Sequence, residues 1–327
     1  MIKDTLLFAL VFASSLLLTA LFESRLIPAF SRNAAQPIYE GGPAWHMKKS
    51  GTPTMGGIGF LLPVMLIGFL YDLFLLTSGN REEALLLFTA LMFALLNALI
   101  GLLDDLTKLR HKENKGLSAK EKLFLQIGAV ALFLFSRRML FGAGSSFFIF
   151  GKEIELGAFY YPLIALMLTG LINFANLTDG IDGLASTVAF SAGIALFYVS
   201  FTHNASSAAI AAMLIGSTVG FLIFNIHPAK IFMGDTGSLF LGALVAVSAL
   251  DAGGPLTIVG AGIVYILEGA SVIIQVLVFK LTKKRVFKMA PLHHHLEKSG
   301  WSENKICISA ILLTLLSSFL LLILPSR

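Results

Sequence analysis

Long apolar runs recur along the whole chain, and they restrict its fold more than any other feature. A helix needs about 20 mainly apolar residues to cross the hydrocarbon core of a bilayer. Only 13% of the residues are charged, which is too little charge to cover a water-facing surface. The sequence therefore predicts an all-α polytopic membrane protein whose residues 1–327 form a single integral-membrane domain. The ten expected transmembrane helices are 5–22, 55–76, 84–103, 119–135, 159–175, 184–201, 208–224, 238–252, 255–279 and 306–324.

Three of these segments depart from a plain crossing. The first is too long for the apolar part of a cleaved signal, and no small-x-small cleavage site precedes Glu23, so we expect a retained helix. The ninth, 255–279, is long and contains Glu268, which predicts a bent or split helix. In 136–158, glycines at 142, 144 and 151 separate short apolar pieces, and this pattern predicts a small hairpin.

Basic residues set the expected orientation. Eighteen of the 24 Lys and Arg residues lie in or beside the loops after helices 1, 3, 5, 7 and 9. Because basic residues collect on the cytoplasmic side, both termini are expected to be extracytoplasmic. In a membrane chain this asymmetry, rather than nucleic-acid binding, explains the basic pI of 9.3, and no nucleic-acid partner is expected. The single cysteine, Cys307, can form no internal disulfide.

The polar motifs lie almost entirely on the expected cytoplasmic side. They occupy residues 48–57, 104–108, 173–183, 225–238 and 291–297. Although far apart in the sequence, they can meet in one site if the predicted topology holds.

Five aspartates at helix ends carry the strongest chemical signal: Asp104, Asp105, Asp179, Asp182 and Asp235. A carboxylate at bilayer depth costs roughly 2.5–3.5 kcal/mol, and neighbouring carboxylates also repel one another. A divalent cation removes both penalties, and oxygen ligands suit Mg²⁺ or Mn²⁺ better than zinc. Since Mg²⁺ usually takes one or two protein carboxylates, the others are left to act as a base, hold a sugar hydroxyl or anchor a lysine. The alternative for the pair at 104–105 is a solvated helix end.

Basic and aromatic residues near the acids have several interpretations. His293, His294 and His295 are adjacent, so on a regular helix they point about 100° apart and cannot all bind one zinc ion. They can donate to phosphate or move protons, or they can form a solvated run. Lys108 lies four residues after Asp104, on the same helical face. The other candidate phosphate partners are Lys48, Lys49 and Lys120. Phe232 is a candidate for core packing or for stacking on a base. Glu268 is expected to lie within the membrane, and an acid at that depth is by default a candidate functional residue.

The segments DDxxK, NxxNxxDGxDG and MGDTGS together resemble the polyprenyl-phosphate N-acetylhexosamine-1-phosphate transferases. Within that superfamily, KxGTPTMGG and PxHHHxE resemble the phospho-N-acetylmuramoyl-pentapeptide transferase branch. The resemblance implies a Mg²⁺-dependent homodimeric enzyme of ten transmembrane helices in the bacterial plasma (inner) membrane, with its active site on the cytoplasmic face. It implies transfer of phospho-MurNAc-pentapeptide from UDP-MurNAc-pentapeptide to undecaprenyl phosphate, which yields lipid I and UMP.

The resemblance also implies roles for single residues. Asp235 would hold Mg²⁺, and Asp104 would act as the base, supported by Asp105. Lys108 and His294 complete the expected catalytic group. The nucleoside and sugar pocket would be shaped by Asp179, Gly180, Asp182 and Phe232. The diphosphate and sugar region would be lined by Lys49, Thr54, Lys108, Lys120, Asn176, Asn225, His293, His294 and His295.

Three rival functions stay open at this point. A sister enzyme would use UDP-GlcNAc, and the contiguous histidines with Glu297 favour the muramoyl branch instead. A cation or proton transporter would need charges near mid-membrane in several helices, whereas only Glu268 fits. A lipid-binding scaffold without catalysis is disfavoured by the glycines that bracket the acids. Within the enzyme reading, direct attack by the lipid phosphate and a two-step route through an aspartyl intermediate both remain possible.

Overall fold

The computed structural model describes residues 2–33, 49, 51–111, 116–142, 145–149 and 152–323. Lys48 and the glycines at 144 and 151, which the sequence singled out, lie outside this described part, as do residue 1 and residues 324–327. The helices are α1 (Ile2–Asn33), α2 (Gly57–Thr77), α3 (Arg81–His111), α4 (Ala119–Phe141), α5 (Tyr160–Thr178), α6 (Leu184–Ser200), α7 (Ala205–Asn225), α8 (Gly234–Gly253), α9 (Pro255–Ala261), α10 (Ile263–Thr282), α11 (Leu292–Glu297) and α12 (Glu303–Ile323).

The described helices form the membrane bundle that the apolar runs predict. Nine of them are long and apolar enough to cross a bilayer, among them α1, α8 and α12. The sixth expected crossing is present as α6, which has only 17 residues and falls below that length. The chain is thus an all-α, multi-pass membrane protein, while the number of ten crossings stays a prediction.

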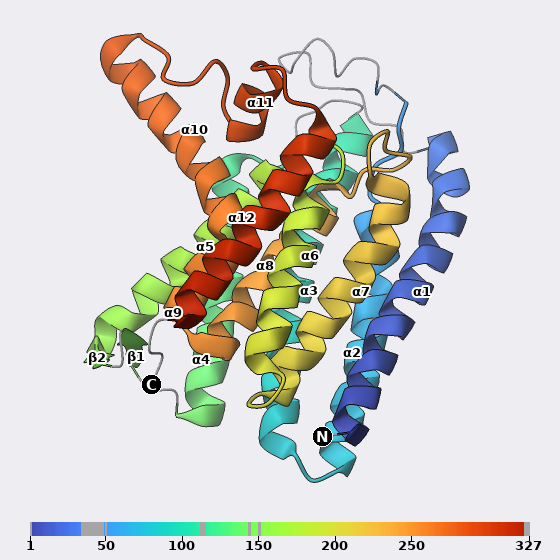
Figure 1. The fold of residues 1–327 in the computed structure, drawn as a ribbon, viewed down its shortest axis with the longest axis vertical. Coiled ribbons are helices and arrows are strands. Elements are labelled where there is room, and N and C mark those ends of the chain that lie inside the picture. Colours follow the sequence, from blue (N-terminus) through green and yellow to red (C-terminus); the bar gives the residue numbers. More distant parts are fainter. Residues whose placement is uncertain are drawn as a thin grey trace.

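The ninth expected crossing is divided, as the sequence predicts. α9 ends at Ala261 and α10 begins at Ile263, with Gly262 between them at φ −96° and ψ 8°. A Cβ atom at this glycine would lie 2.3 Å from Leu171 Cδ1 of α5 and 2.7 Å from the backbone carbonyl oxygen of Ile258, so a larger residue at the break would force its neighbours to shift. Beyond the break, α10 leans away from the bundle (Figure 1).

The predicted hairpin is also present. β1 (Ser146–Ile149) pairs antiparallel with β2 (Lys152–Glu155), in the register Ser146 with Glu155 and Ile149 with Lys152. The hairpin, the first turn of α1 and the last turn of α12 lie at one end of the bundle, and α11 with the motif-bearing loops lies at the other (Figure 1). This arrangement agrees with both chain ends facing one side, although which side faces the cytoplasm stays a prediction.

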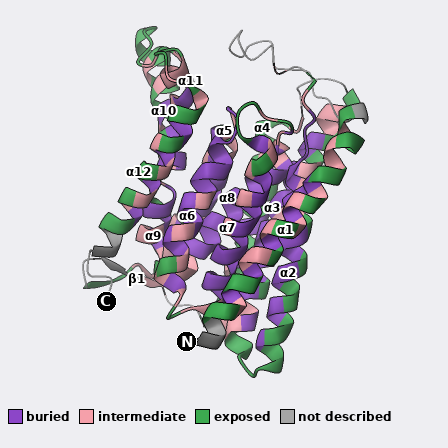
Figure 2. Ribbon diagram, turned by 45° about the vertical axis from the view of Figure 1, so that its right-hand side comes forward, coloured by how far each residue is buried: buried purple, intermediate pink, exposed green. Residues whose placement is uncertain are grey.

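α8 forms the centre of the bundle. Nearly all of its residues from Thr236 to Ala249 are buried, and it packs against α3, α5 and α6 (Figure 2). A helix that is apolar on every side must be enclosed by others, which explains its position. α2 approaches it closely at one point, because a Cβ atom at Gly57 would lie 2.3 Å from the backbone of Gly237. The enclosed α8 carries Asp235 at its first turn, so the packing places this acid among the ends of α3, α4 and α5.

Candidate active site

A pocket of about 230 Å³ opens at the end of the bundle where the polar motifs gather. Its walls come from the loop before α2, the last turns of α3 and α5, and the segment from α7 to α8. Four of the five sequence motifs therefore converge here, as predicted from the topology. The lining residues are Lys49, Thr54, Asp105, Lys108, Asp179, Gly180, Ile181, Asp182, Asn225, Phe232, Gly234 and Asp235.

Asp235 is the acid with the most cationic surroundings. Its Oδ2 lies 2.5 Å from Lys122 Nζ and 3.3 Å from Lys108 Nζ. Its Oδ1 accepts from Asn176 Nδ2 at 3.0 Å, and the same amide donates to the hydroxyl of Ser238 at 2.8 Å. Two ammonium groups and an amide thus hold the carboxylate in one orientation, facing the pocket.

Asp105 holds the start of α8. Its Oδ1 accepts from the backbone N–H of Asp235 at 3.0 Å, and its Oδ2 accepts from the N–H and hydroxyl of Thr236 at 2.9 and 2.7 Å. The backbone reaches this position through Gly234, which has φ +70°, a conformation that favours glycine. A Cβ atom there would lie 2.7 Å from Asp105 Oδ2. Asp105 therefore acts as an N-terminal cap that places Asp235, while its expected support of Asp104 as the base stays a prediction.

Asp104 connects α3 to the start of α4. It pairs with Lys108 at 2.6 Å and Lys122 at 3.2 Å, and its Oδ1 accepts from the backbone N–H of Leu117 at 2.8 Å. A capping box on Ser118 begins α4 directly after this contact. The start of α4 is thereby fixed so that its fourth residue, Lys122, faces the acids.

Lys122 was not among the site residues expected from the sequence, whereas Lys120 was. In the structure Lys120 is exposed and does not line the pocket, and Lys122 makes the two ion pairs. Residues two apart on a helix point about 200° apart, so only one of the pair can face the acids. The capping box at Ser118 is the sequence signal that could have set the helical phase.

Asp179 lies at the end of α5, in the pocket wall. Burial raises the pKa of Asp179 well above its usual range, and the negative charges of Asp235, Asp105 and Asp182 raise it further. The cation of Lys108 opposes this shift only in part. The pocket therefore favours the protonated form of this side chain, which can donate a hydrogen bond.

Asp182 belongs to a second group of charges at the same end. Its carboxylate contacts Lys49 Nζ at 2.7 Å, His227 Nδ1 at 2.9 Å and the backbone N–H of Ala229 at 3.0 Å. Glu303, at the start of α12, contacts Lys49 Nζ at 2.8 Å. Neither His227 nor Glu303 was among the site residues expected from the sequence; His227 lies within the motif at 225–238, whereas no motif marks Glu303.

The expected histidines do not line the pocket. His293 is fully buried, and its backbone N–H and Nδ1 both lie 3.1 Å from the Glu268 carboxylate. It lies behind Gly180, where a Cβ atom would come within 2.3 Å of His293 Nε2. His294 contacts Glu297 at 2.7 Å, and His295 accepts from the backbone N–H of Lys288 at 3.1 Å. Their expected roles, the catalytic one of His294 included, remain predictions.

The other expected residues lie at the pocket. Thr54, Gly180, Asn225 and Phe232 line it, and Asn176 reaches it through its bond to Asp235. Asn225 donates to the Ile231 carbonyl at 2.9 Å and so helps to hold the segment between α7 and α8 in the pocket wall.

Three of the carboxylates could share a divalent ion. One oxygen from each of Asp104, Asp105 and Asp235 lies within 4.8 Å of the others. An all-oxygen set of this kind fits Mg²⁺, which commonly uses one or two carboxylates and keeps positions for phosphate and water. Asp105 is the least available of the three, because both of its oxygens already accept hydrogen bonds from the start of α8, and Asp235 lines the pocket, unlike Asp104. The residues present therefore fit the metal expected from the sequence.

Comparisons with known proteins agree with this site. Residues 84–253 match Glycosyl transferase family 4. Relatives named phospho-N-acetylmuramoyl-pentapeptide-transferase are 42% identical over 287 residues in Thermoanaerobacter sp., covering 87% of this chain and 88% of the relative, and 41% identical over 312 residues in Halalkalibacterium halodurans, covering 94% of each. This chain belongs to the phospho-N-acetylmuramoyl-pentapeptide-transferase family. A relative with the same name from Caldanaerobacter subterraneus is 40% identical over 318 residues, covering 95% of this chain and 96% of its own. The matched length includes every motif described above.

Proposed function

We propose that the chain transfers phospho-MurNAc-pentapeptide from UDP-MurNAc-pentapeptide to undecaprenyl phosphate and releases UMP, forming lipid I. The observation that carries this proposal is the Asp235 carboxylate held between Lys108 and Lys122, beside Asp104, at one end of an apolar bundle. Phosphoryl transfer depends mainly on positioning and charge neutralisation, which this arrangement supplies. Membership of the family supports the same reaction.

Both substrates are anionic, and both need cations at this depth. Lys108 and Lys122 offer ammonium groups next to the pocket, and each pairs with two carboxylates. These ion pairs keep the lysines extended toward the pocket before a substrate arrives. The lipid carrier's chain is suited by the exposed apolar faces of the surrounding helices, and its phosphate group by the charged end of the bundle.

Asp235 is the proposed Mg²⁺ ligand, with Asp104 at its side. When bound, Mg²⁺ supplies charge neutralisation at the diphosphate and favours departure of UMP. Asn176 fixes the Asp235 carboxylate from the opposite side to the two lysines. Asp105 fixes the backbone below it, so the ligand geometry is set before the substrate binds.

Asp104 is the proposed base that receives a proton from the lipid phosphate. Lys108 and Lys122 stabilise its ionised form through contacts at 2.6 and 3.2 Å. In the direct route, a lipid phosphate oxygen bonds to the sugar-side phosphorus as the bond from that phosphorus to the UMP oxygen breaks. We favour this route because both oxygens of Asp105, one of the acids that line the pocket, already accept hydrogen bonds and are less available as an alternative nucleophile.

The proposed setting is the plasma membrane of a bacterial cell, with the pocket on the cytoplasmic face and the protein as a homodimer. The basic residues of the loops at the pocket end support this orientation, since Lys and Arg collect on the cytoplasmic side. A UDP-linked substrate made in the cytoplasm would reach such a pocket without crossing the membrane.

A product assay with two donors tests the proposal. Purified protein in detergent with undecaprenyl phosphate and Mg²⁺ receives either UDP-MurNAc-pentapeptide or UDP-GlcNAc, and lipid products are separated by chromatography. The proposal expects a lipid product from the muramoyl donor alone. A product from UDP-GlcNAc instead would assign the chain to the sister activity. Ion flux through the protein reconstituted in liposomes, without any lipid product, would favour a transporter.

A further inference from the structure

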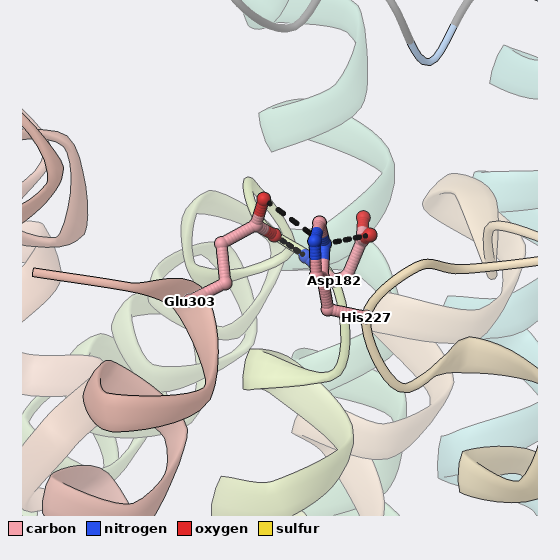
Figure 3. A group of neighbouring side chains, drawn as sticks. All are labelled: Asp182, His227 and Glu303. Carbon is pink, nitrogen blue, oxygen red and sulfur yellow. Dashed lines mark hydrogen bonds and ion pairs between the residues drawn. The ribbon is translucent and has the colours of Figure 1, made fainter.

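Four ionisable side chains join α12 to the pocket wall. Lys49, Asp182, His227 and Glu303, here called the Glu303 latch, come from four separate segments of the chain. Figure 3 shows Asp182, His227 and Glu303 pointing toward one another. Glu303 Oε2 accepts from Lys49 Nζ and from the backbone N–H of Asp182, both at 2.8 Å. Its Oε1 lies 3.3 Å from His227 Nδ1. A single carboxylate thus contacts the three other members.

The latch also resembles a metal site in composition, because one ligand atom from each of Asp182, His227 and Glu303 lies within 4.8 Å of the others. Its donor set includes a histidine nitrogen, so it suits Mg²⁺ less well than the all-oxygen set of Asp104, Asp105 and Asp235 does. Lys49 Nζ contacts both carboxylates of the latch, at 2.7 and 2.8 Å, and supplies the positive charge that the two acids need. We therefore describe the group as an ion-pair network.

Two members of the latch face the pocket, while Glu303 does not. Lys49 and Asp182 line the pocket, and Glu303 lines a separate neighbouring hollow with His227 and Trp301. Glu303 can therefore reach a substrate in the pocket only through its partners. Its side chain is 11% exposed, so its ion pair is shielded from water more than a surface pair is.

Glu303 occupies only part of the hydrogen-bonding capacity of Lys49. Lys49 Nζ has three N–H groups, and Asp182 and Glu303 take two of them. Among the described residues no other acceptor contacts this ammonium, so its third N–H remains for a ligand in the pocket. The Asp182 carboxylate is filled by Lys49, His227 and Ala229, and its backbone N–H by Glu303. Glu303 thus fixes both the lysine and the turn that carries Asp182.

We propose that Glu303 is a positioning residue that holds Lys49 and the Asp182 turn in the geometry that binds the nucleotide-linked substrate. This inference rests on the proposed transferase function, and it concerns donor binding rather than the chemical step. Loss of the charge at Glu303 leaves Lys49 paired with Asp182 alone and weakens the acceptor of the Asp182 backbone N–H, so the ammonium and the turn lose the fixed position that the substrate requires. Substrate binding then weakens equally in the ground and transition states, which raises KM and leaves kcat little changed.

The test compares Glu303→Gln with Glu82→Gln by steady-state kinetics for both substrates. Glu82 is a matched control because it also lies in the first turn of a membrane helix, α3, and is exposed. For Glu303→Gln we expect KM for the UDP-linked substrate to rise about 10-fold, with kcat and the KM for undecaprenyl phosphate within about 2-fold. Glu82→Gln is expected to match the unmodified chain.

A double-mutant cycle with Lys49→Met shows whether Glu303 acts through the lysine. If it does, Glu303→Gln changes the donor KM less than about 2-fold in the Lys49→Met background. Full additivity of the two effects, or a lower melting temperature of Glu303→Gln with an unchanged donor KM, would overturn the proposal. If the unmodified chain releases no UMP, the transferase proposal fails first. If it is active and Glu303→Gln leaves the donor KM unchanged, only the positioning role fails.

Discussion

Lys122 of α4 donates to Asp235 of α8 at 2.5 Å, although 113 residues separate the two in the sequence. The same ammonium lies 3.2 Å from Asp104 of α3, so one lysine connects three helices at the pocket. A cation shared between two buried acids lowers their mutual repulsion and faces the place where substrate phosphates would gather. The ammonium of Lys122 thus offsets negative charge on both Asp104 and Asp235.

The first prediction compares the two lysines at the start of α4. Lys122→Gln is expected to lower kcat/KM for UMP release about 100-fold or more, because it removes a preorganised cation from the pocket. Lys120 is exposed, so Lys120→Gln is expected to stay within about 2-fold. Equal losses in the two variants would show that the lysines act through the overall charge of the loop.

The second prediction concerns the close contact of α2 and α8. Gly57→Ala places a methyl group 2.3 Å from the Gly237 backbone, so it is expected to destabilise the protein by about 1–3 kcal/mol. Gly128→Ala is the control, since a Cβ atom there meets nothing within 4 Å. Thermal unfolding in detergent measures both. If Gly57→Ala has the same melting temperature as Gly128→Ala, the close contact of α2 with α8 would be contradicted.

The third prediction follows from the raised pKa of Asp179. A buried acid of this kind destabilises the folded state once it ionises, so stability is retained at low pH and lost as pH rises through the raised pKa. Asp179→Asn removes this loss. With EDTA present, we expect the variant to melt above the unmodified chain at pH 8 and the difference to shrink toward pH 4. A constant difference across this range would contradict the assigned ionisation.

The fourth prediction addresses orientation. In a Cys307→Ser background, Glu155→Cys in β2 and Arg285→Cys after α10 are both exposed positions at opposite ends of the bundle (Figure 1). A membrane-impermeant maleimide is expected to label position 155 in intact spheroplasts and position 285 only after permeabilisation. The reverse pattern would place the pocket on the outer face and remove the basis for a cytoplasmic donor.

The sequence predicted the fold well wherever a local pattern carried the information. Apolar runs located the membrane helices, and the excess length of 255–279 predicted the break that occurs at Gly262. Glycine spacing predicted the hairpin of β1 and β2. The length threshold of a crossing was less informative for α6, whose 17 residues are short for a span.

The candidate site was predicted in its location but not in all its members. Topology indicated that the acids could come together, because helix ends on one side of a membrane can share a site, and the acids of α3, α5 and α8 do so. The direction in which each side chain points was harder to predict, since Lys120 and Lys122 differ only in their position around the helix. His293 lies buried against Glu268, a pairing across 25 residues that no spacing rule predicts. Glu303 could not be predicted from the sequence, because its place beside the pocket wall depends on where α12 begins in the fold.

UMP release from UDP-MurNAc-pentapeptide by the purified protein tests the central claim most directly. The account predicts UMP only when undecaprenyl phosphate and Mg²⁺ are both present, and a rate near background for Asp235→Ala. The acid cluster would lose its proposed role if Asp235→Ala released UMP at a near-normal rate with unchanged Mg²⁺ dependence.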